Sequence, residues 1–316
     1  MTLREALRHS EELLRAGPHP TRARLDAEAL LLHLTGKNRA WLLAHAADPF
    51  GGCTATQYAA LLQRRLTGEP IQYITGTCEF FGLPFHVTRD VLIPRPETEH
   101  LVETAIQLLM GAPCMTAAAG ERHGWESDTP NPAAPPSALH NSPARILDIG
   151  TGSGAIAIAL AHHLPNARVT ATDVSPAALS IACENAERNH VAERIRFLQG
   201  DLLAPVALSD ATTEAFDLIV SNPPYISAAD RDTLAVEVRD FEPHAALLAG
   251  DEGLDLYRRL IPAAFAALVP SGWLVLEIGY GQSESVPALC AAAGFPRITT
   301  TPDLQGIPRV LAAQRA

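Results

Sequence analysis

Ile146-Leu147-Asp148-Ile149-Gly150-Thr151-Gly152-Ser153-Gly154 is the stretch that decides the fold. Its apolar start predicts a short strand, and glycine at every second position predicts a tight turn into a helix. Glycine there accepts positive φ and lets a ligand approach the main chain without meeting a Cβ atom. The G-x-G-x-G spacing lacks the third glycine position of the dinucleotide fingerprint, so we expect an adenosine-type cofactor rather than a pyrophosphate. A turn that binds nothing is the alternative.

Outward from this loop, strand and helix patterns alternate from residue 145 to the end of the chain. Such alternation predicts a parallel sheet with helices on both faces, an α/β fold. We expect strands at 145–149, 168–172, 195–199, 216–220, 273–278, 297–301 and 309–312. We expect helices at 153–163, 175–189, 254–268 and 283–293.

Before the loop, the chain contains three segments with different residue patterns. Residues 1–70 carry apolar side chains at helical spacing, which predicts a small helical bundle. They are Leu3, Leu7, Leu14, Leu25, Ala29, Leu32, Tyr58, Leu61, Leu62 and Leu66. Residues 71–110 predict a hairpin through 78–81 and 85–87, then a helix from Pro96 to about Met110. Residues 111–144 hold six prolines and eight alanines, so we expect a mobile insert.

Composition narrows the function. The 24 Lys and Arg against 35 Asp and Glu give a net charge of −11, which disfavours long nucleic acids as partners. The cysteines show no C-x-x-C spacing, so neither a disulfide framework nor a metal site is predicted, and we expect buried or inert thiols. They are Cys53, Cys78, Cys114, Cys183 and Cys290. No apolar run approaches the ~20 residues of a membrane span, and the N-terminus lacks the apolar stretch of a signal peptide, so we expect a cytoplasmic protein.

Two acidic residues follow neighbouring expected strands. Asp173 lies at the end of the second strand, where a carboxylate can accept hydrogen bonds from both ribose hydroxyls. Its alternative role is to cap the helix that begins near Ser175. Asp201 can accept from an exocyclic adenine amine or can simply be a solvated loop acid, and Leu202 would offer an apolar face to the adenine ring.

Asn222-Pro223-Pro224-Tyr225 follows the fourth expected strand, at the edge of the sheet where open α/β proteins bind ligands. The prolines fix φ and remove backbone donors, which leaves their carbonyls as acceptors. The side-chain oxygen of Asn222 and the carbonyl of Pro223 can together accept both N–H bonds of an NH2 group. A planar nitrogen held this way turns its lone-pair face toward an electrophilic methyl group without needing a strong base. A turn that only ends a strand is the alternative.

Roles follow from this chemistry. We predict catalytic roles for Asn222, Pro223 and Tyr225, with Pro224 added among the substrate contacts and Tyr225 stacking on a flat substrate. Cofactor contacts are predicted for Gly150, Thr151, Gly152, Ser153, Gly154, Asp173, Asp201, Leu202 and Asn222.

Together these features resemble the class I methyltransferases that modify planar amide or amine nitrogens. Within them, the sequence is similar to the peptide chain release factor glutamine methyltransferases, the HemK or PrmC family, over nearly its whole length. The specific segments are Gly68-Glu69-Pro70-Ile71-Gln72-Tyr73-Ile74-Thr75-Gly76, Ile93-Pro94-Arg95-Pro96-Glu97-Thr98-Glu99 and Ser221 through Ile226.

The resemblance implies a Rossmann-like class I methyltransferase sheet, mostly parallel with an antiparallel last strand. It also implies S-adenosylmethionine as cofactor and the glutamine of the Gly-Gly-Gln motif in class-1 release factors as substrate, with a monomeric enzyme expected. The parts would be a substrate-recognition bundle (1–70), a connector (71–110), the insert (111–144) and a cofactor-binding domain (145–316). The insert is longer than the family pattern, and Leu202 stands where some relatives carry an aromatic residue. Arg95 and Glu97 either border the cofactor pocket or only initiate a helix.

Three other functions stay open at this point. An adenine-N6 nucleic-acid methyltransferase uses the same kind of loop on a flipped base, although the acidic charge opposes it. A non-catalytic adaptor would keep the cofactor fold without activity. An NAD oxidoreductase is disfavoured by the glycine spacing.

Overall fold

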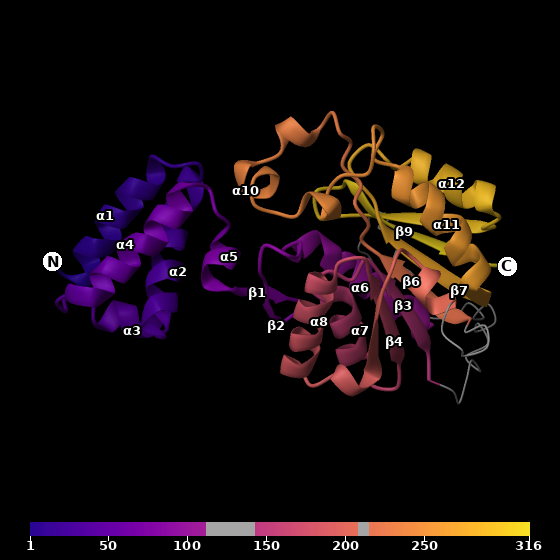
Figure 1. The fold of residues 1–316 in the computed structure, drawn as a ribbon, viewed down its shortest axis with the longest axis horizontal. Coiled ribbons are helices and arrows are strands. Elements are labelled where there is room, and N and C mark those ends of the chain that lie inside the picture. The colour runs from indigo at the N-terminus through magenta and orange to yellow at the C-terminus, as the bar shows by residue number, and fades with distance from the viewer. Residues whose placement is uncertain (112–142, 208–214) are drawn as a thin grey trace, which may run out of the picture. The chain divides into compact units, whose positions relative to one another are not determined.

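The computed structural model describes residues 1–111, 143–207 and 215–316. Their contacts form two compact units. The colours of Figure 1 run along the chain by residue number. The first unit contains residues 1–78, 86–93 and 230–244, and the second contains 79–85, 94–229 and 245–316. The predicted insert lies, apart from its ends, outside the described residues. The division into four functional parts stays a prediction, because the compact units reflect contacts rather than roles.

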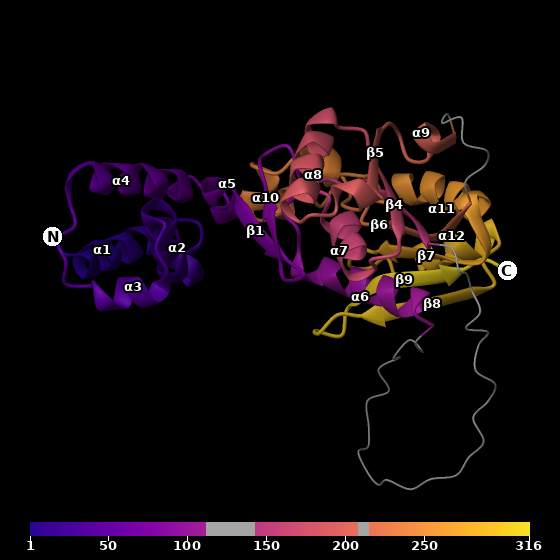
Figure 2. The ribbon, with the colours of Figure 1, turned by 90° about the horizontal axis from the view of Figure 1, so that it is seen from below.

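The first unit is mainly helical, as predicted. Its principal helices are α1 (Leu3–Arg15), α2 (Ala23–Thr35), α3 (Arg39–Ala44), α4 (Gly52–Leu66), α5 (Ile71–Thr75) and α10 (Val236–Arg239). Figure 2 shows α1 to α4 gathered into a bundle. A capping box begins α1, because the Thr2 hydroxyl accepts from the Glu5 amide while the Glu5 carboxylate accepts from the Thr2 amide. The hairpin of β1 (Thr77–Phe80) and β2 (Leu83–His86) follows in the sequence, and its residues 79–85 belong to the second unit.

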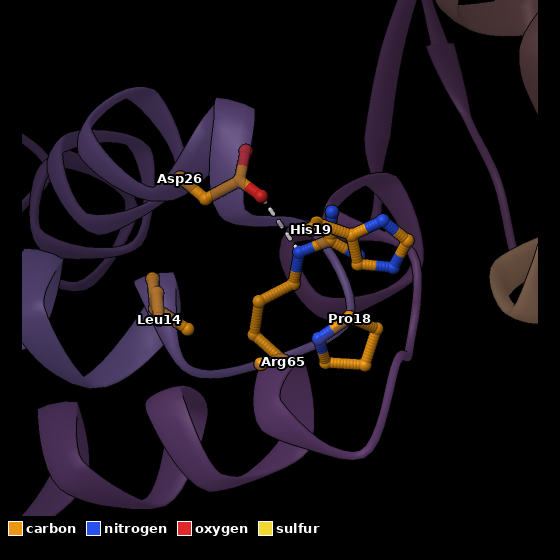
Figure 3. Close-up of a pocket in the computed structure, with 6 residues that line it drawn as sticks. Leu14, Pro18, His19, Asp26 and Arg65 are labelled. Carbon is orange, nitrogen blue, oxygen red and sulfur yellow. Dashed lines mark hydrogen bonds and ion pairs between the residues drawn. The ribbon is translucent and has the colours of Figure 1, made fainter.

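The buried face of α2 includes charged side chains. Leu25, which contributes to the helical spacing, is 55% exposed. The helix instead turns Asp26 inward, where the carboxylate accepts from Arg65 Nε at 2.7 Å (Figure 3). Arg65 is itself 2% exposed, and its Nη1 donates to the Glu69 carbonyl at 2.8 Å and lies 3.2 Å from Glu237 Oε2. A buried ion pair between helices therefore sets the rotation of α2.

The second unit contains an open sheet in the order β5-β4-β3-β6-β7-β9-β8. Its strands are β3 (Arg145–Ile149), β4 (Arg168–Asp173), β5 (Ile195–Gln199), β6 (Phe216–Ser221), β7 (Leu268–Glu277), β8 (Arg297–Pro302) and β9 (Pro308–Gln314). The ladders from β5 to β7 are parallel, whereas β9 runs antiparallel to both β7 and β8. The predicted Rossmann-like sheet with an antiparallel last strand is confirmed.

Helices cover both faces of this sheet. They are α6 (Pro96–Leu109), α7 (Ala155–His163), α8 (Pro176–Arg188), α11 (Asp255–Ala267) and α12 (Ser285–Ala293), with a short α9 (Ala204–Ala207) after β5. Successive side chains of a strand point to opposite faces. Leu147 and Ile149 pack in one core cluster with residues of α11, whereas Asp148 between them accepts from the backbone of α7. These two helices therefore lie on opposite faces of the sheet (Figure 1).

The cysteines only partly match the expectation. Cys290 is fully buried, and burial raises the pKa of its thiol to about 12. Cys53 and Cys183 are exposed, so for these two the alternative of inert thiols stays a prediction. Cys114 lies outside the described residues. Across the described ranges, no helix is both long and apolar enough to span a membrane.

Candidate active site

The glycine loop joins β3 to α7 and leaves its backbone open. The amides of Gly150 and Thr151 both donate to the Thr172 carbonyl, at 2.8 and 3.0 Å, which ties the loop to the end of β4. Gly150 and Gly152 have φ of 72° and 55°, and a Cβ atom on either would meet no described atom within 4 Å. A Cβ atom on Gly154 would instead lie 2.8 Å from Ile158 Cδ1. The first two glycines thus leave space for a ligand, while the third permits close packing of α7.

Asp173 supports this loop from the neighbouring strand. One carboxylate oxygen accepts from the Gly152 amide and the other from the Ser175 amide, both at 2.9 Å. The cap of α8 is Ser175, whose hydroxyl accepts from the Ala178 amide. Asp173 is therefore not the cap of this helix. Its carboxylate keeps unused lone pairs, so the predicted contact with ribose hydroxyls stays a prediction.

Asp148 belongs to the site but was missed by the sequence prediction. Its side chain is fully buried, and its Oδ2 accepts from the Thr151 hydroxyl at 2.6 Å and from the Ala157 amide at 3.2 Å. Its Oδ1 has no hydrogen-bond partner among the described residues. Burial raises the pKa of this carboxyl to about 7. A carboxyl group inside an apolar strand was the signal that could have identified it.

The end of β5 lies next to Asp173, since the Gly200 amide donates to the Asp173 carbonyl at 2.9 Å. Asp201 is exposed there and pairs with Arg259 of α11, which agrees with its alternative role as a solvated acid. Leu202 has φ of 50° and packs against the core cluster on the α11 face. Contacts of both residues with adenine stay predictions.

The Asn-Pro-Pro-Tyr loop begins beside the glycine loop. Ser221 and Ile149 are register partners at the ends of β6 and β3, and the Ser221 hydroxyl donates to the Ile149 carbonyl at 2.7 Å. The residues that follow these two positions are Asn222 and Gly150. The parallel ladder therefore places both loops at one edge of the sheet, as the sequence predicts.

Asn222 is held by a residue that the prediction assigned only to a helix. Its Nδ2 donates to the hydroxyl of Thr98, in the first turn of α6, at 3.0 Å. The Thr98 hydroxyl in turn donates to Glu277 Oε2 at 2.6 Å. Glu277 ends the otherwise apolar β7 and is 2% exposed. A carboxylate in that apolar run was again the available signal.

Arg95 and Pro96 begin α6 at its N-cap and first position, so helix initiation by this segment is observed. The near-site role predicted for Arg95 and Glu97 stays a prediction. Thr98, one residue further along, is the member of this segment that contacts the Asn-Pro-Pro-Tyr loop.

The Tyr225 end of the loop is fixed from several sides. Its hydroxyl lies 3.3 Å from Glu277 Oε1, and its carbonyl accepts from Gln282 Nε2 at 3.1 Å. A Cβ atom on Gly253 would come 2.2 Å from that carbonyl oxygen, so glycine is required there. Burial, reinforced by the nearby charge of Glu277, raises the pKa of Tyr225 above its ordinary value. Burial likewise raises the pKa of Glu277, although the hydroxyls of Thr98 and Tyr225 act in the opposite direction.

Known proteins match this chain along its whole length. The PrmC N-terminal domain family matches residues 5–76, and the methyltransferase small domain family matches residues 137–248. A release factor glutamine methyltransferase from Moorella thermoacetica is 42% identical, over 100% of this chain and 99% of its own length. One from Geobacter sulfurreducens is 41% identical, over 92% of this chain and 88% of its own. This chain belongs to the release factor glutamine methyltransferases.

Solved structures with the same fold are more distant. The hMettl16 catalytic domain in complex with MAT2A 3′UTR hairpin 6 has a TM-score of 0.52 and 18% identity, over 82% of this chain and 81% of its own. The Thermus thermophilus 16S rRNA methyltransferase RsmC in complex with AdoMet and guanosine has a TM-score of 0.50 and 20% identity, over 76% and 50%. At these identities the likeness shows the methyltransferase fold alone. Membership of the release factor glutamine methyltransferases confirms the family inferred from the sequence.

Proposed function

We propose that this chain transfers a methyl group from S-adenosylmethionine to the side-chain amide nitrogen (N5) of glutamine. The target is the glutamine of the Gly-Gly-Gln motif in class-1 peptide chain release factors. The observation that carries the proposal is the position of Asn222, whose amide NH2 is committed to Thr98 beside the glycine loop. The Oδ1 of Asn222 is then the atom available to accept from a substrate amide.

The site fits S-adenosylmethionine. Gly150 and Gly152 leave open space above the loop backbone, and Asp173 keeps acceptor capacity at the adjacent strand end. Asp148 Oδ1 is a buried acceptor without a partner among the described residues, which suits a ligand that brings a cationic amine. We therefore assign cofactor binding to residues 150–154 and Asp173, with Asp201, Leu202 and Asn222 at its border. S-adenosylmethionine, when bound, supplies an electrophilic methyl group on sulfur.

Catalysis by these residues consists of positioning. Asn222 Oδ1 and the Pro223 carbonyl accept the two N–H bonds of the glutamine amide and so fix the plane of its nitrogen. The lone-pair face of that nitrogen then points to the methyl donor, and the two acceptors stabilise the positive charge that develops on the nitrogen. The nitrogen sheds a proton once it has gained positive charge, so no strong base is required. Pro224 and the ring of Tyr225 complete the wall against which the flat amide stacks.

Mass spectrometry of a release factor incubated with this protein and S-adenosylmethionine tests the proposal. We expect the mass of one added methyl group on the glutamine of the Gly-Gly-Gln peptide and none on a factor with alanine at that glutamine. Asn222→Ala should lower kcat by about a hundredfold or more. Asn166→Ala, at an exposed position in the second unit, is the matched control and should retain full activity.

Nucleic acid serves as the competing substrate in the same assay. Radiolabel transferred to duplex DNA or ribosomal RNA, with none on the release factor, would replace glutamine by adenine as the target. The net charge of −11 supports a protein substrate. A release factor as partner also supports a cytoplasmic enzyme, which we propose acts as a monomer.

A further inference from the structure

The strongest unassigned feature of the second unit is a hydrogen-bond chain behind Asn222. It runs from Glu277 on β7 through Thr98 on α6 to Asn222 after β6, with successive distances of 2.6 and 3.0 Å. Glu277 and Thr98 are 2% and 4% exposed. The members lie 179 and 124 residues apart in sequence, so the chain exists only in the folded unit.

The number of protons on each group determines which group donates and which accepts in this series of hydrogen bonds. A threonine hydroxyl carries one proton, and an ionised carboxylate can only accept. Thr98 therefore donates its proton to Glu277 and has only lone pairs left for Asn222. Asn222 must donate to Thr98 with its NH2 group, because its oxygen in that position would place two acceptors 3.0 Å apart. The orientation of the Asn222 amide is thus determined by the carboxylate of Glu277.

The same carboxylate also holds the other end of the substrate loop. Glu277 Oε1 accepts from the Tyr225 hydroxyl, so both Asn222 and Tyr225 depend on it, the first through Thr98. The groups that face Glu277 are Thr98 and Glu97 from α6, Tyr225 from the loop, Tyr257 from α11 and Arg309 from β9. Arg309 also pairs with Asp303, at 3.3 Å. Burial makes the ionised form of Glu277 costly, whereas the hydrogen bonds from Thr98 and Tyr225 favour it, and only this ionised form fixes the direction of the hydrogen bonds.

We propose that Glu277 and Thr98 are positioning residues that make Asn222 present its Oδ1, rather than its NH2, to the substrate amide. This inference rests on the proposed function of Asn222. A glutamine NH2 needs an acceptor, so reversing the Asn222 amide would place donor against donor and exclude the productive pose. If Glu277 is protonated, its hydroxyl can donate a hydrogen bond to Thr98. The Thr98 hydroxyl can then donate to the side-chain oxygen of Asn222, which permits the reversed amide.

The matched variants are Thr98→Val and Thr98→Ser. Thr98→Val keeps the shape and removes the relay, and we expect kcat to fall about 10- to 100-fold, the range given by one unmade buried hydrogen bond. KM for the release factor and calorimetric binding of S-adenosylmethionine should change less than about threefold. Thr98→Ser retains the hydroxyl and should recover most of kcat. Equal loss in both variants, or no loss in Thr98→Val, would overturn the inference.

A pH profile tests the carboxylate. The kcat of the unaltered protein should fall at acidic pH as Glu277 takes up a proton. Glu277→Gln cannot titrate, and its amide can still accept from Thr98 while its NH2 faces the Tyr225 oxygen. This variant should keep partial activity and lose that acidic limb. An unchanged limb would contradict the role of Glu277.

Side-chain NMR makes the outcome independent of the methylation assay. With 15N-labelled protein, the Asn222 NH2 signal, assigned by its loss in Asn222→Asp, should exchange slowly in the unaltered protein and in Thr98→Ser. It should exchange at least about tenfold faster in Thr98→Val. If release factor is not methylated but this pattern holds, the proposed function fails while the directed chain stands. If methylation occurs and the exchange rates do not differ, the positioning role fails.

Discussion

Each compact unit buries charged side chains, but the two units treat the charge differently. In the first unit, the cation Arg65 meets the carboxylates of Asp26 and Glu237, so opposite charges offset each other. In the second unit, Glu277 is bound by hydroxyls, and Asp148 by a hydroxyl and an amide. Burial raises the pKa values of both these carboxyls. The ion pairs of Arg65 join helices of the first unit, whereas the carboxyls of Glu277 and Asp148 lie behind the substrate loop and the cofactor loop.

Removing the Arg65 cation should have the largest effect on stability. Arg65→Ala removes the 2.7 Å ion pair of the buried Asp26 and the contact with the half-buried Glu237, and we expect the free energy of unfolding to fall by about 3–5 kcal/mol. Urea denaturation measures this loss. Arg15→Ala removes a surface pair with Glu11 and should cost less than about 0.5 kcal/mol. Similar costs for the two variants would show that the buried cluster is not structural.

In the second unit, removing a buried charge should raise the free energy of unfolding instead of lowering it. The pKa of Asp148 is about 7 in the folded protein against an ordinary 3.8, so the unfolded chain ionises first as pH rises. The folded state therefore loses stability progressively between those values, and the full cost is present above pH 7. Asp148→Asn removes that cost, so its unfolding free energy relative to the unaltered protein should rise by about 2–4 kcal/mol from pH 4 to pH 8.

Denaturation at both pH values measures the Asp148→Asn effect, with the exposed Asp251→Asn as control. An equal change of stability at pH 4 and pH 8 would mean that folding does not shift the pKa of this carboxyl, contrary to the expectation.

Glu277→Gln should raise stability for the same reason as Asp148→Asn, but by a smaller amount. The pKa of Glu277 is raised from 4.5, so ionisation also costs the folded state stability as pH rises above that value. Bonds from Thr98 and Tyr225 and the charge of Arg309 offset part of this cost. The variant should gain unfolding free energy at pH 8, by less than Asp148→Asn, while kcat declines. Thermal melting at two pH values beside kcat tests whether stability and activity separate.

An uncharged buried contact should show the smallest effect. The Tyr58 hydroxyl donates to the Ala27 carbonyl at 2.9 Å inside the first unit, and burial raises its pKa to about 12. Tyr58→Phe should cost about 1 kcal/mol and should do so equally at pH 5 and pH 8, because nothing there titrates in that range. A pH-dependent cost would mean that the hydroxyl is coupled to the charged groups of the unit.

Periodicity predicted the sheet because each of its strands and helices carries its own local pattern. The same logic placed the glycine loop and Asn222 at one edge, since parallel strands share their carboxyl ends. This logic does not identify partners that are distant in sequence. Asp26 pairs with Arg65 across 39 residues, and this pairing, not the spacing of Leu25, decides which face of α2 is buried.

The candidate site shows the same limit. Asn222 could be recognised from its tetrapeptide, but Thr98 looked like an ordinary first-turn residue and Glu277 like the end of a strand. Only the packing of α6 against the sheet brings these residues together. Polar residues inside apolar strands, Asp148 and Glu277, were visible in the sequence and are the more general clue.

The excursion of residues 230–244 into the first unit has a consequence for dissecting this protein. The boundary between the units cuts the chain at five peptide bonds, after residues 78, 85, 93, 229 and 244. A fragment ending near residue 78 would keep Arg65 and lose Glu237, which lies in the excursion. The helical unit is therefore a discontinuous module, which cannot be transplanted to another methyltransferase by a single junction. A chimera would need the excursion grafted as well, directly downstream of the Asn-Pro-Pro-Tyr loop.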